Sequence, residues 1–333
     1  MQVVSITDVD EIRHLTKADP VPIVSQSLIR VHVVGLNRLD LLMLHGDLSV
    51  PLPHTPGSDL VGSVVDSPSG RFPSGARVLV NPALPEQPDT SWPPSRECEY
   101  VRILGCHTQG ALAEYVLVPD EQLYPVPDAL SDSEAATLPL DYLTAWRMLV
   151  SKAQVEAGDR VVVWGASGSL GCAAIAILSH LGATPIALVG RSSDAEVLRQ
   201  HGAAVCIDYR SPDLLARVRN VTDGGPTVVF ESVGSSTWQA TQEMVRQGGR
   251  IVICGTTSGG VAPTDLEELY YKQVSVHGSR MGYPAEFEAM LQAVREGGLR
   301  PAPIALTVPF SEAERGLAYL ETRVRPGKVL VQL

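Results

Sequence analysis

The amino-acid sequence predicts an α/β protein in which a doubly wound parallel sheet is joined to a second, β-rich domain. In the middle of the chain, short apolar runs alternate with helical stretches, which is typical of a parallel sheet with crossover helices. The first part of the chain holds β-branched runs separated by Pro and Gly clusters. Because 333 residues exceed what one hydrophobic core usually serves, we expect two domains.

The first 127 residues contain the strand-like runs LIRVHVVGLN, LVGSVVDS, ARVLV and LAEYVLVP. We expect them to form a compact β-rich domain over residues 1–127. Residues 82–94 are rich in proline and polar side chains and predict an irregular surface lobe.

A different pattern begins at Ser131, which forms a capping box with Glu134 and opens a helix that is interrupted at Pro139. Thr264 and Glu267 predict a second capping box. Six strands are expected at 161–164, 185–189, 204–208, 227–231, 250–254 and 274–277. They define a predicted domain over residues 128–283.

The last fifty residues hold a predicted helix at 285–296, a helix that opens at Ser311 and a final strand, KVLVQL. We expect residues 284–333 to complete the first domain, with the active site in the cleft between the two.

The composition limits the possible partners. Hydrophobic residues make up 44% and charged residues 19%, as in an ordinary globular protein, and the formal net charge is −11 without any basic run. Nucleic acid and anionic membrane surfaces need clustered Lys and Arg, so neither is expected as a partner. No apolar run approaches the roughly 20 residues that span a bilayer, and the N-terminus lacks the features of a signal peptide, so we expect a cytoplasmic location.

The segment VVVWGASGSLGCAAIAILSHLG predicts a buried strand, a glycine turn and a helix. Gly165, Gly168 and Gly171 are spaced so that the turn is tight, backbone approaches a phosphate and helix packs on strand. The N-terminal amides and positive dipole end of the helix then point at an anion. We expect Ser167, Ser169 and Leu170 to hold the pyrophosphate of a dinucleotide with these glycines.

The residues after the second strand of this sheet indicate which dinucleotide is bound. An NAD-binding chain usually places an acidic residue there, on the ribose hydroxyls. This chain has Gly190, Arg191, Ser192 and Ser193, and a guanidinium with two hydroxyls can pair with a 2′-phosphate. NADPH is therefore the expected cofactor; the alternative is that Arg191 is a solvated surface residue.

The five cysteines are Cys98, Cys106, Cys172, Cys206 and Cys254. None has the spacing of a metal knuckle, and their number is odd, so neither a metal site nor a disulfide framework is expected. Cys172, Cys206 and Cys254 lie in helix-like or strand-like runs and are interpreted as small buried hydrophobes.

The chain as a whole resembles the medium-chain dehydrogenase/reductase superfamily. The likeness lies in GLNRLDLLMLHG, PGSDLVGSVVD, GARVLVNP, LAEYVLVP, PLDYLTAW, the glycine turn, VFESVG, GGRIVICGTTSG, HGSRMG and GKVLVQL. It implies a Rossmann domain and a GroES-like catalytic domain. The nucleotide half also looks like that of crotonyl-CoA reductases.

The resemblance fails at the zinc ligands. The places of the catalytic zinc ligands in alcohol dehydrogenases of this superfamily align with Asn37, Ser58 and Leu140, which cannot replace thiolate and imidazole. At the family's structural zinc site only Cys98 has a counterpart, and Cys106 with His107 falls short of four ligands. We expect no metal.

Without a Lewis acid to stabilise an alkoxide, the easier hydride acceptor is a carbon conjugated to a carbonyl. The chain is thus similar to the zinc-independent quinone oxidoreductase and enoyl reductase branch, which implies an NADPH-dependent reductase of an activated C=C bond or a quinone. The alternatives are a biosynthetic tailoring enzyme that reduces or cyclises a natural-product intermediate, and a non-catalytic NADPH-binding protein.

Candidate catalytic residues come from several parts of the chain. Asn37 is a candidate donor to the nicotinamide ribose or the substrate carbonyl, or it caps a turn. Leu48 stands where many zinc-free relatives carry a tyrosine acid. The substitutes considered are Tyr142, Tyr271, Lys272 and His45, with solvent as the remaining proton source.

The resemblance also implies cofactor contacts beyond the glycine turn. They are Thr144 at the nicotinamide, Tyr209 near the adenosine phosphate, and Val233, Gly234, Gly255, Thr256 and Ser279 at the strand ends. Asp194 replaces a lysine of the related quinone reductases, so Arg191 has to do its work. The glycines have the alternative role of plain turns. By analogy with relatives we expect a homodimer, joined through the edge strand at 274–278.

Overall fold

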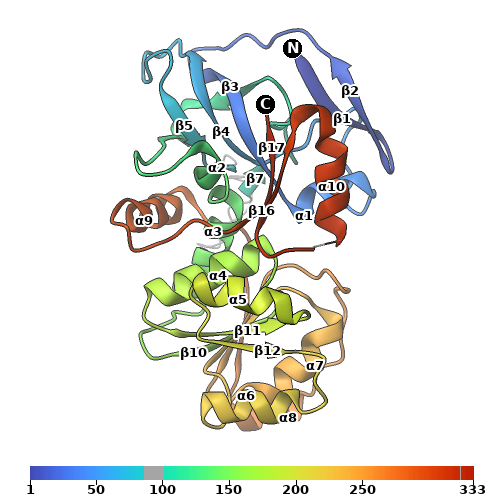
Figure 1. Cartoon of the computed structure of the whole chain (residues 1–333), viewed down its shortest axis with the longest axis vertical. Coiled ribbons are helices and arrows are strands. Elements are labelled where there is room, and N and C mark those ends of the chain that lie inside the picture. The colour runs from blue at the N-terminus through green and yellow to red at the C-terminus, as the bar shows by residue number, and fades with distance from the viewer. Residues whose placement is uncertain (86–100, 323) are drawn as a thin grey trace, which may run out of the picture.

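The structure, a computed structural model, describes residues 1–85, 101–322 and 324–333. Most of the predicted lobe at 82–94, and Cys98, lie outside these residues. Figure 1 shows two sheets, one above the other, with the two chain ends in the upper half. Both predicted sheets are therefore present.

The upper sheet is mainly antiparallel and joins the first part of the chain to its end. Its seven strands are β16 (Ile304–Pro309), β17 (Lys328–Gln332), β3 (Gln26–Leu36), β4 (Asp59–Asp66), β5 (Arg77–Val80) and β9 (Leu123–Pro125) in spatial order, with β8 (Tyr115–Pro119) paired to β3. Beside it lie the hairpin of β1 (Gln2–Asp8) and β2 (Glu11–Thr16), the pair of β6 (Ala83–Pro85) and β7 (Val101–Ile103), and helix α1 (Arg38–Leu44). As predicted, the last strand of the chain returns to this sheet, where it pairs with β3.

The lower sheet is parallel throughout and has six strands. Their spatial order is β12 (Val205–Asp208), β11 (Thr184–Val189), β10 (Arg160–Val163), β13 (Val228–Glu231), β14 (Arg250–Ile253) and β15 (Ser275–Gly278). The crossover helices are α4 (Ser169–His180), α5 (Ser192–Gln200), α6 (Leu214–Thr222), α7 (Ser235–Met244) and α8 (Leu266–Lys272). The strand order reverses between β10 and β13, which is where ligands bind in doubly wound sheets.

Alternate residues of β10 explain why both faces of this sheet are covered. Val161 and Val163 belong to a buried cluster with α4, whereas Val162 packs with Leu214 of α6 and Trp238 of α7. Side chains of a strand alternate between faces, so a continuous apolar run such as VVV forms a strand that is buried on both sides.

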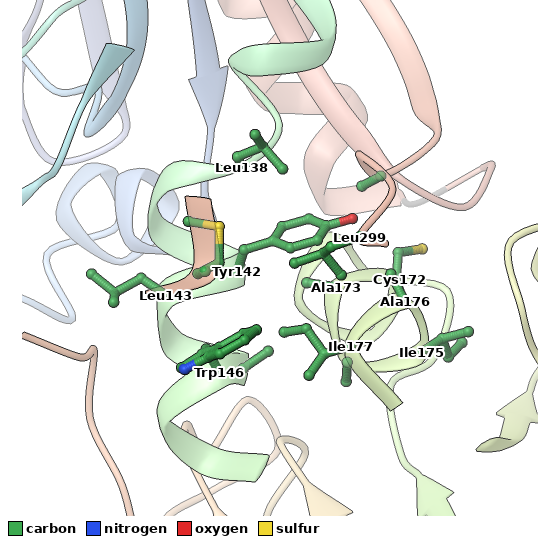
Figure 2. Close-up of a cluster of buried hydrophobic side chains, with 14 of the residues drawn as sticks. Leu138, Tyr142, Leu143, Trp146, Cys172, Ala173, Ile175, Ala176, Ile177 and Leu299 are labelled. Carbon is green, nitrogen blue, oxygen red and sulfur yellow. The ribbon is translucent and has the colours of Figure 1, made fainter. Parts of the chain in front are cut away.

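Helix α3 (Pro139–Trp146) connects the two halves. Its side chains pack on α4, and Figure 2 shows Tyr142 and Trp146 of α3 facing Ala173 and Ile177 of α4. The same cluster contains Val33 of β3 in the upper sheet, so the apolar core is continuous between the sheets. The boundaries at 127/128 and 283/284 remain predictions.

The helix signals are confirmed in part. Ser131 caps α2 (Asp132–Ala135) in a capping box with Glu134, and α3 begins at Pro139. The predicted box at Thr264 is wrong by one residue, because Asp265 caps α8 while Thr264 accepts a hydrogen bond from the indole of Trp238. Helix α9 spans Pro284–Arg295, and a short 3₁₀ turn, Phe310–Glu312, leads into α10 (Ala313–Thr322). No helix in the described part of the chain is long and apolar enough to cross a bilayer.

Candidate active site

A pocket of about 390 Å³ lies between the two sheets. Its lower wall comes from the glycine turn and from the ends of β13 and β14, and its upper wall comes from α1, α3, α10 and β17. The residues that line the lower wall include Gly165, Ser167, Gly168, Ser169, Leu170, Val233, Gly255 and Thr256, and those of the upper wall include Asn37, Leu39, Leu42, Leu140, Asp141, Thr144, Tyr319 and Gly327. This pocket occupies the cleft in which we expected the active site.

The glycine turn is shaped as its spacing predicts. Gly165 has a φ of +66°, in the left-handed region that favours glycine. A Cβ on Gly171 would lie 2.3 Å from the carbonyl oxygen of Gly165, so helix and turn pack too closely for any side chain. Gly168, the N-cap of α4, provides no side-chain cap, which leaves the first amides of the helix for a ligand. A pyrophosphate fits this end of α4.

A second pocket, of about 420 Å³, continues from the turn to the segments that follow β11 and β12. Trp164, Arg191, Asp194 and Tyr209 line it, and it shares Gly165, Ser167 and Gly168 with the first pocket. The rings of Trp164 and Tyr209 lie 6.0 Å apart. The two pockets thus form one cleft with the glycine turn in the middle, as a dinucleotide requires.

Most of the predicted cofactor residues lie on this cleft. Thr144, Val233, Gly255 and Thr256 line the first pocket, and Arg191 and Tyr209 line the second. The other three lie next to it. Gly234, the N-cap of α7, follows the lining residue Val233, and Ser192 begins α5 directly after Arg191. Ser279 precedes the lining residues Arg280 and Met281, and its hydroxyl donates to the carbonyl of Arg280.

A buried ionic cluster lies against the upper wall. The ammonium of Lys328, which is fully buried, donates to Asn37 Oδ1 at 2.7 Å, to Asp59 Oδ2 at 2.6 Å and to Asp141 Oδ2 at 2.6 Å. Asn37 Nδ2 donates in turn to Asp59 Oδ2 at 3.0 Å and to the carbonyl of Gly35 at 3.3 Å. We call Asn37, Asp59, Asp141 and Lys328 the lysine cluster.

Burial and the charges within the lysine cluster both shift the pKa values of this region. Burial opposes the charged form of Lys328, but the carboxylates of Asp141 and Asp59 outweigh it and hold the pKa of the ammonium above its ordinary value. Burial raises the pKa of Asp59, although the ammonium opposes this shift. Asp40 is buried beside the cluster, and burial raises its pKa to about 6 even though it accepts backbone hydrogen bonds from Asn37 and Gly57. Two carboxylates therefore share one ammonium directly under the pocket wall.

The three places that align with zinc ligands hold no ligand set. Asn37 is tied into the lysine cluster, Leu140 presents a hydrocarbon to the pocket, and the hydroxyl of Ser58 is buried without a hydrogen-bond partner. In the described ranges, no three His, Cys, Asp or Glu side chains come together as a metal site. Cys106 is buried, and His107 accepts a hydrogen bond from the backbone of Ile103.

Two predicted catalytic residues, Tyr142 and Lys272, do not line the pocket, which argues against both as proton donors. The hydroxyl of Tyr142 is buried and donates to the carbonyl of Arg300 at 2.5 Å, and burial raises its pKa well above the ordinary value. In Figure 2 this ring points into the cluster between α3 and α4. Lys272 pairs with Glu268 on α8 and donates to the carbonyls of Gln242 and Glu243.

The other two candidate acids, Tyr271 and His45, do not line the pocket either. Tyr271 is 67% exposed on α8, and His45 at the end of α1 pairs with Asp10 and Glu321. Sequence reasoning missed Asp141, Lys328 and Cys254, of which Asp141 and Cys254 line the pocket. Burial raises the pKa of the Cys254 thiol to about 11, so it is neutral at pH 7.

Fold and cleft together define a dinucleotide-dependent oxidoreductase built from a parallel sheet and a β-rich domain. Residues 24–128 match the family described as "Alcohol dehydrogenase GroES-like domain", and residues 169–296 match "Zinc-binding dehydrogenase". The chain belongs to the medium-chain dehydrogenase/reductase superfamily, in its zinc-independent quinone oxidoreductase and enoyl reductase branch.

Individual relatives agree with this membership. Quinone oxidoreductase of Pongo abelii is 28% identical over 295 residues, covering 85% of this chain and 82% of that protein. Crotonyl-CoA reductase of Streptomyces avermitilis is 32% identical over 307 residues, covering 83% and 67%. A solved structure of an NAD-dependent alcohol dehydrogenase superposes with a TM-score of 0.93 at 32% identity, covering all of both chains.

Proposed function

We propose that this protein is an NADPH-dependent reductase that transfers a hydride to an activated C=C bond of an enone or enoyl compound, or to a quinone. The observation that carries the proposal is the lysine cluster, because it holds Asn37 at the aligned first-ligand place by hydrogen bonds to Lys328 and Asp59. Asn37 is therefore already bound to protein partners at a place where relatives use a zinc ligand. The similarity to quinone and crotonyl-CoA reductases supports the same class of acceptor.

The cofactor would lie along the cleft. The first turn of α4 would hold its pyrophosphate, Thr144, Val233 and Gly255 would border its nicotinamide, and Arg191 would meet a 2′-phosphate. Bound there, the cofactor supplies the hydride. We propose NADPH because Arg191 follows β11 where NAD-binding chains carry a carboxylate.

The chain's own residues then bind and orient the acceptor. Leu39, Leu42, Leu140 and Met281 give the pocket an apolar wall, which suits a hydrophobic acceptor. We propose that Asn37 keeps its bonds to Lys328 and Asp59 and shares the N–H of its longest hydrogen bond, 3.3 Å to Gly35, with the acceptor carbonyl, where it stabilises the negative charge that develops.

The proton comes from solvent in this proposal. Lys328 has committed its three N–H groups to Asn37, Asp59 and Asp141, and the neutral Cys254 thiol is a weak acid. None of the four predicted acids, Tyr142, Tyr271, Lys272 and His45, is among the described residues that line the pocket.

The test is the loss of NADPH absorbance with a panel of quinones, enones and enoyl thioesters. We expect turnover with at least one class, unchanged by a chelator or by added zinc. Activity that a chelator abolishes and zinc restores would contradict the metal-free mechanism, and binding of NADPH without turnover of any acceptor would leave a purely binding role. Asn37→Ala, against Leu39→Ala as a matched wall residue, should lower kcat more than it raises KM for the acceptor.

We also propose that the protein is a homodimer through β15. This strand is the edge of the parallel sheet, and Val276 on it is 44% exposed. The neighbouring α8 has no buried residue and exposes Leu266, Tyr270 and Tyr271. An exposed apolar edge requires a cover. Light scattering should give the mass of a dimer for the native chain and of a monomer for Val276→Lys.

A further inference from the structure

We propose that Asp194 is a specificity-determining residue of the cofactor site, and that it weakens the preference for NADPH so that NADH is also accepted. The inference rests on the proposed function, because it concerns the adenosine end of the same cleft. It goes beyond that function by assigning a role to the buried carboxylate that lines this end of the cleft.

Asp194 lies in the first turn of α5 and is only 3% exposed, yet it lines the second pocket. Its Oδ2 accepts a hydrogen bond from the hydroxyl of Ser167 at 2.8 Å and lies 3.7 Å from Nε of Arg191. Its Oδ1 accepts a long hydrogen bond, 3.5 Å, from the hydroxyl of Ser193. The carboxylate thus touches both the pyrophosphate turn and the arginine expected to meet the 2′-phosphate.

The charges in this pocket nearly cancel. Among the described residues that line it, Arg191 is the cation and Asp194 the anion. Arg210, next to Tyr209, is engaged by Asp208 through hydrogen bonds of 3.0 Å and 2.9 Å. A phosphate dianion therefore meets a guanidinium whose charge is already partly neutralised, and a carboxylate that repels it.

A 2′-hydroxyl meets the opposite situation. It can donate a hydrogen bond to a carboxylate, which is how acidic residues recognise the ribose of NAD. Asp194 keeps lone pairs for such a donor, because its side-chain partners are two serine hydroxyls and one guanidinium. The site can thus use Arg191 for one cofactor and Asp194 for the other.

A purely structural role for Asp194 makes a different prediction. If the carboxylate only tethers the glycine turn through Ser167, its loss weakens both cofactors to the same extent. Asp194→Asn keeps the size of the side chain and an acceptor oxygen for Ser167 but removes the charge. Ser167→Ala removes the hydrogen bond but leaves the charge, so the two variants separate the roles.

The experiment measures the dissociation constants of NADPH and NADH by fluorescence titration of the purified protein and its variants, with thermal melting as a check on folding. We expect the native protein to bind the two within about tenfold of each other, and Asp194→Asn to shift the ratio toward NADPH by about tenfold. Arg191→Ala, which truncates a side chain that is 41% exposed, should shift the ratio toward NADH. Ser167→Ala should weaken both without changing the ratio.

Two results would overturn the inference: a native preference for NADPH above about a hundredfold, or a ratio that Asp194→Asn leaves within about twofold of the native value. If Asp194→Asn fails to fold, the native ratio decides, because a preference for NADPH above about a hundredfold contradicts the inference. Failure of the proposed function looks different, because neither cofactor then binds, or both bind without turnover of any acceptor.

Discussion

The buried ammonium of Lys328 should be the most sensitive charge in the protein. Replacing it in Lys328→Met keeps the length of the side chain but leaves Asp59 and Asp141 facing each other without a cation. Removing one partner of a buried ion pair typically costs about 3–5 kcal/mol, and here two carboxylates lose the same partner. Since burial already raises the pKa of Asp59, the loss should shrink as the pH falls and the carboxyls protonate.

Urea unfolding at several pH values measures this effect, with Asp141→Asn as the matched variant. That change leaves Lys328 with Asp59 alone, a balanced pair, so it should destabilise the protein clearly less than Lys328→Met. Lys272→Met, which removes a partly exposed ion pair on α8 and hydrogen bonds to the carbonyls of Gln242 and Glu243, should cost clearly less than Lys328→Met because its partners stay in contact with water. Two results would contradict this charge balance. One is a free energy of unfolding for Lys328→Met within about 1 kcal/mol of the native value, and the other is an equal loss of stability in Lys328→Met and Asp141→Asn.

Three further changes test other parts of the structure. Gly171→Ala places a Cβ against backbone and should reduce dinucleotide binding by about tenfold or more, whereas Gly278→Ala, with open space around it, should not; titration with NADPH checks both. The folded pKa of Asp40, about 6, lies above its unfolded value, so the stability that its neutral carboxyl contributes is lost as the pH rises from about 4 to 6. This loss is on the order of 3 kcal/mol in the free energy of unfolding, and Asp40→Asn should remove it. An unchanged pH profile of that free energy in Asp40→Asn would contradict the buried carboxyl. The hydrogen bond to Asp10 raises the pKa of His45, so the stability that its two ion pairs contribute is complete below its unfolded pKa and is lost as the pH rises through the folded value. In His45→Gln the melting temperature should therefore depend less on pH above neutral. A pH dependence like that of the native protein would argue against the two pairs.

The fold was predictable because it depends on patterns that are local in sequence. The run at 161–164 shows a strand that is buried on both faces, and the strand β10 carries alternate residues into two separate apolar clusters. The spacing of the glycine triplet likewise predicts the tight turn, since a Cβ at Gly171 would have no room. The error of one residue at Thr264 arises where local patterns are ambiguous, because Thr and Asp both cap helices. Here the hydroxyl of Thr264 accepts a hydrogen bond from Trp238, a tertiary neighbour, and Asp265 is the cap.

The site was predictable only where contacts follow from the order of the strands. Lys328 and Asn37 are separated by 291 positions, and neither GKVLVQL nor GLNRLD alone indicates that an ammonium fills the space beside an amide. A charged residue inside an apolar terminal strand is the signal that was present, because a lysine in a buried strand needs carboxylate partners. The same logic separates Asp194 from an ordinary helix-opening carboxylate: its burial beside Arg191 makes its charge felt by whatever binds there. In both places the charged residues are visible in the sequence, but which of them share a partner follows only from the fold. Single substitutions should therefore have their largest effects on stability in the lysine cluster and on cofactor preference at the adenosine end of the cleft.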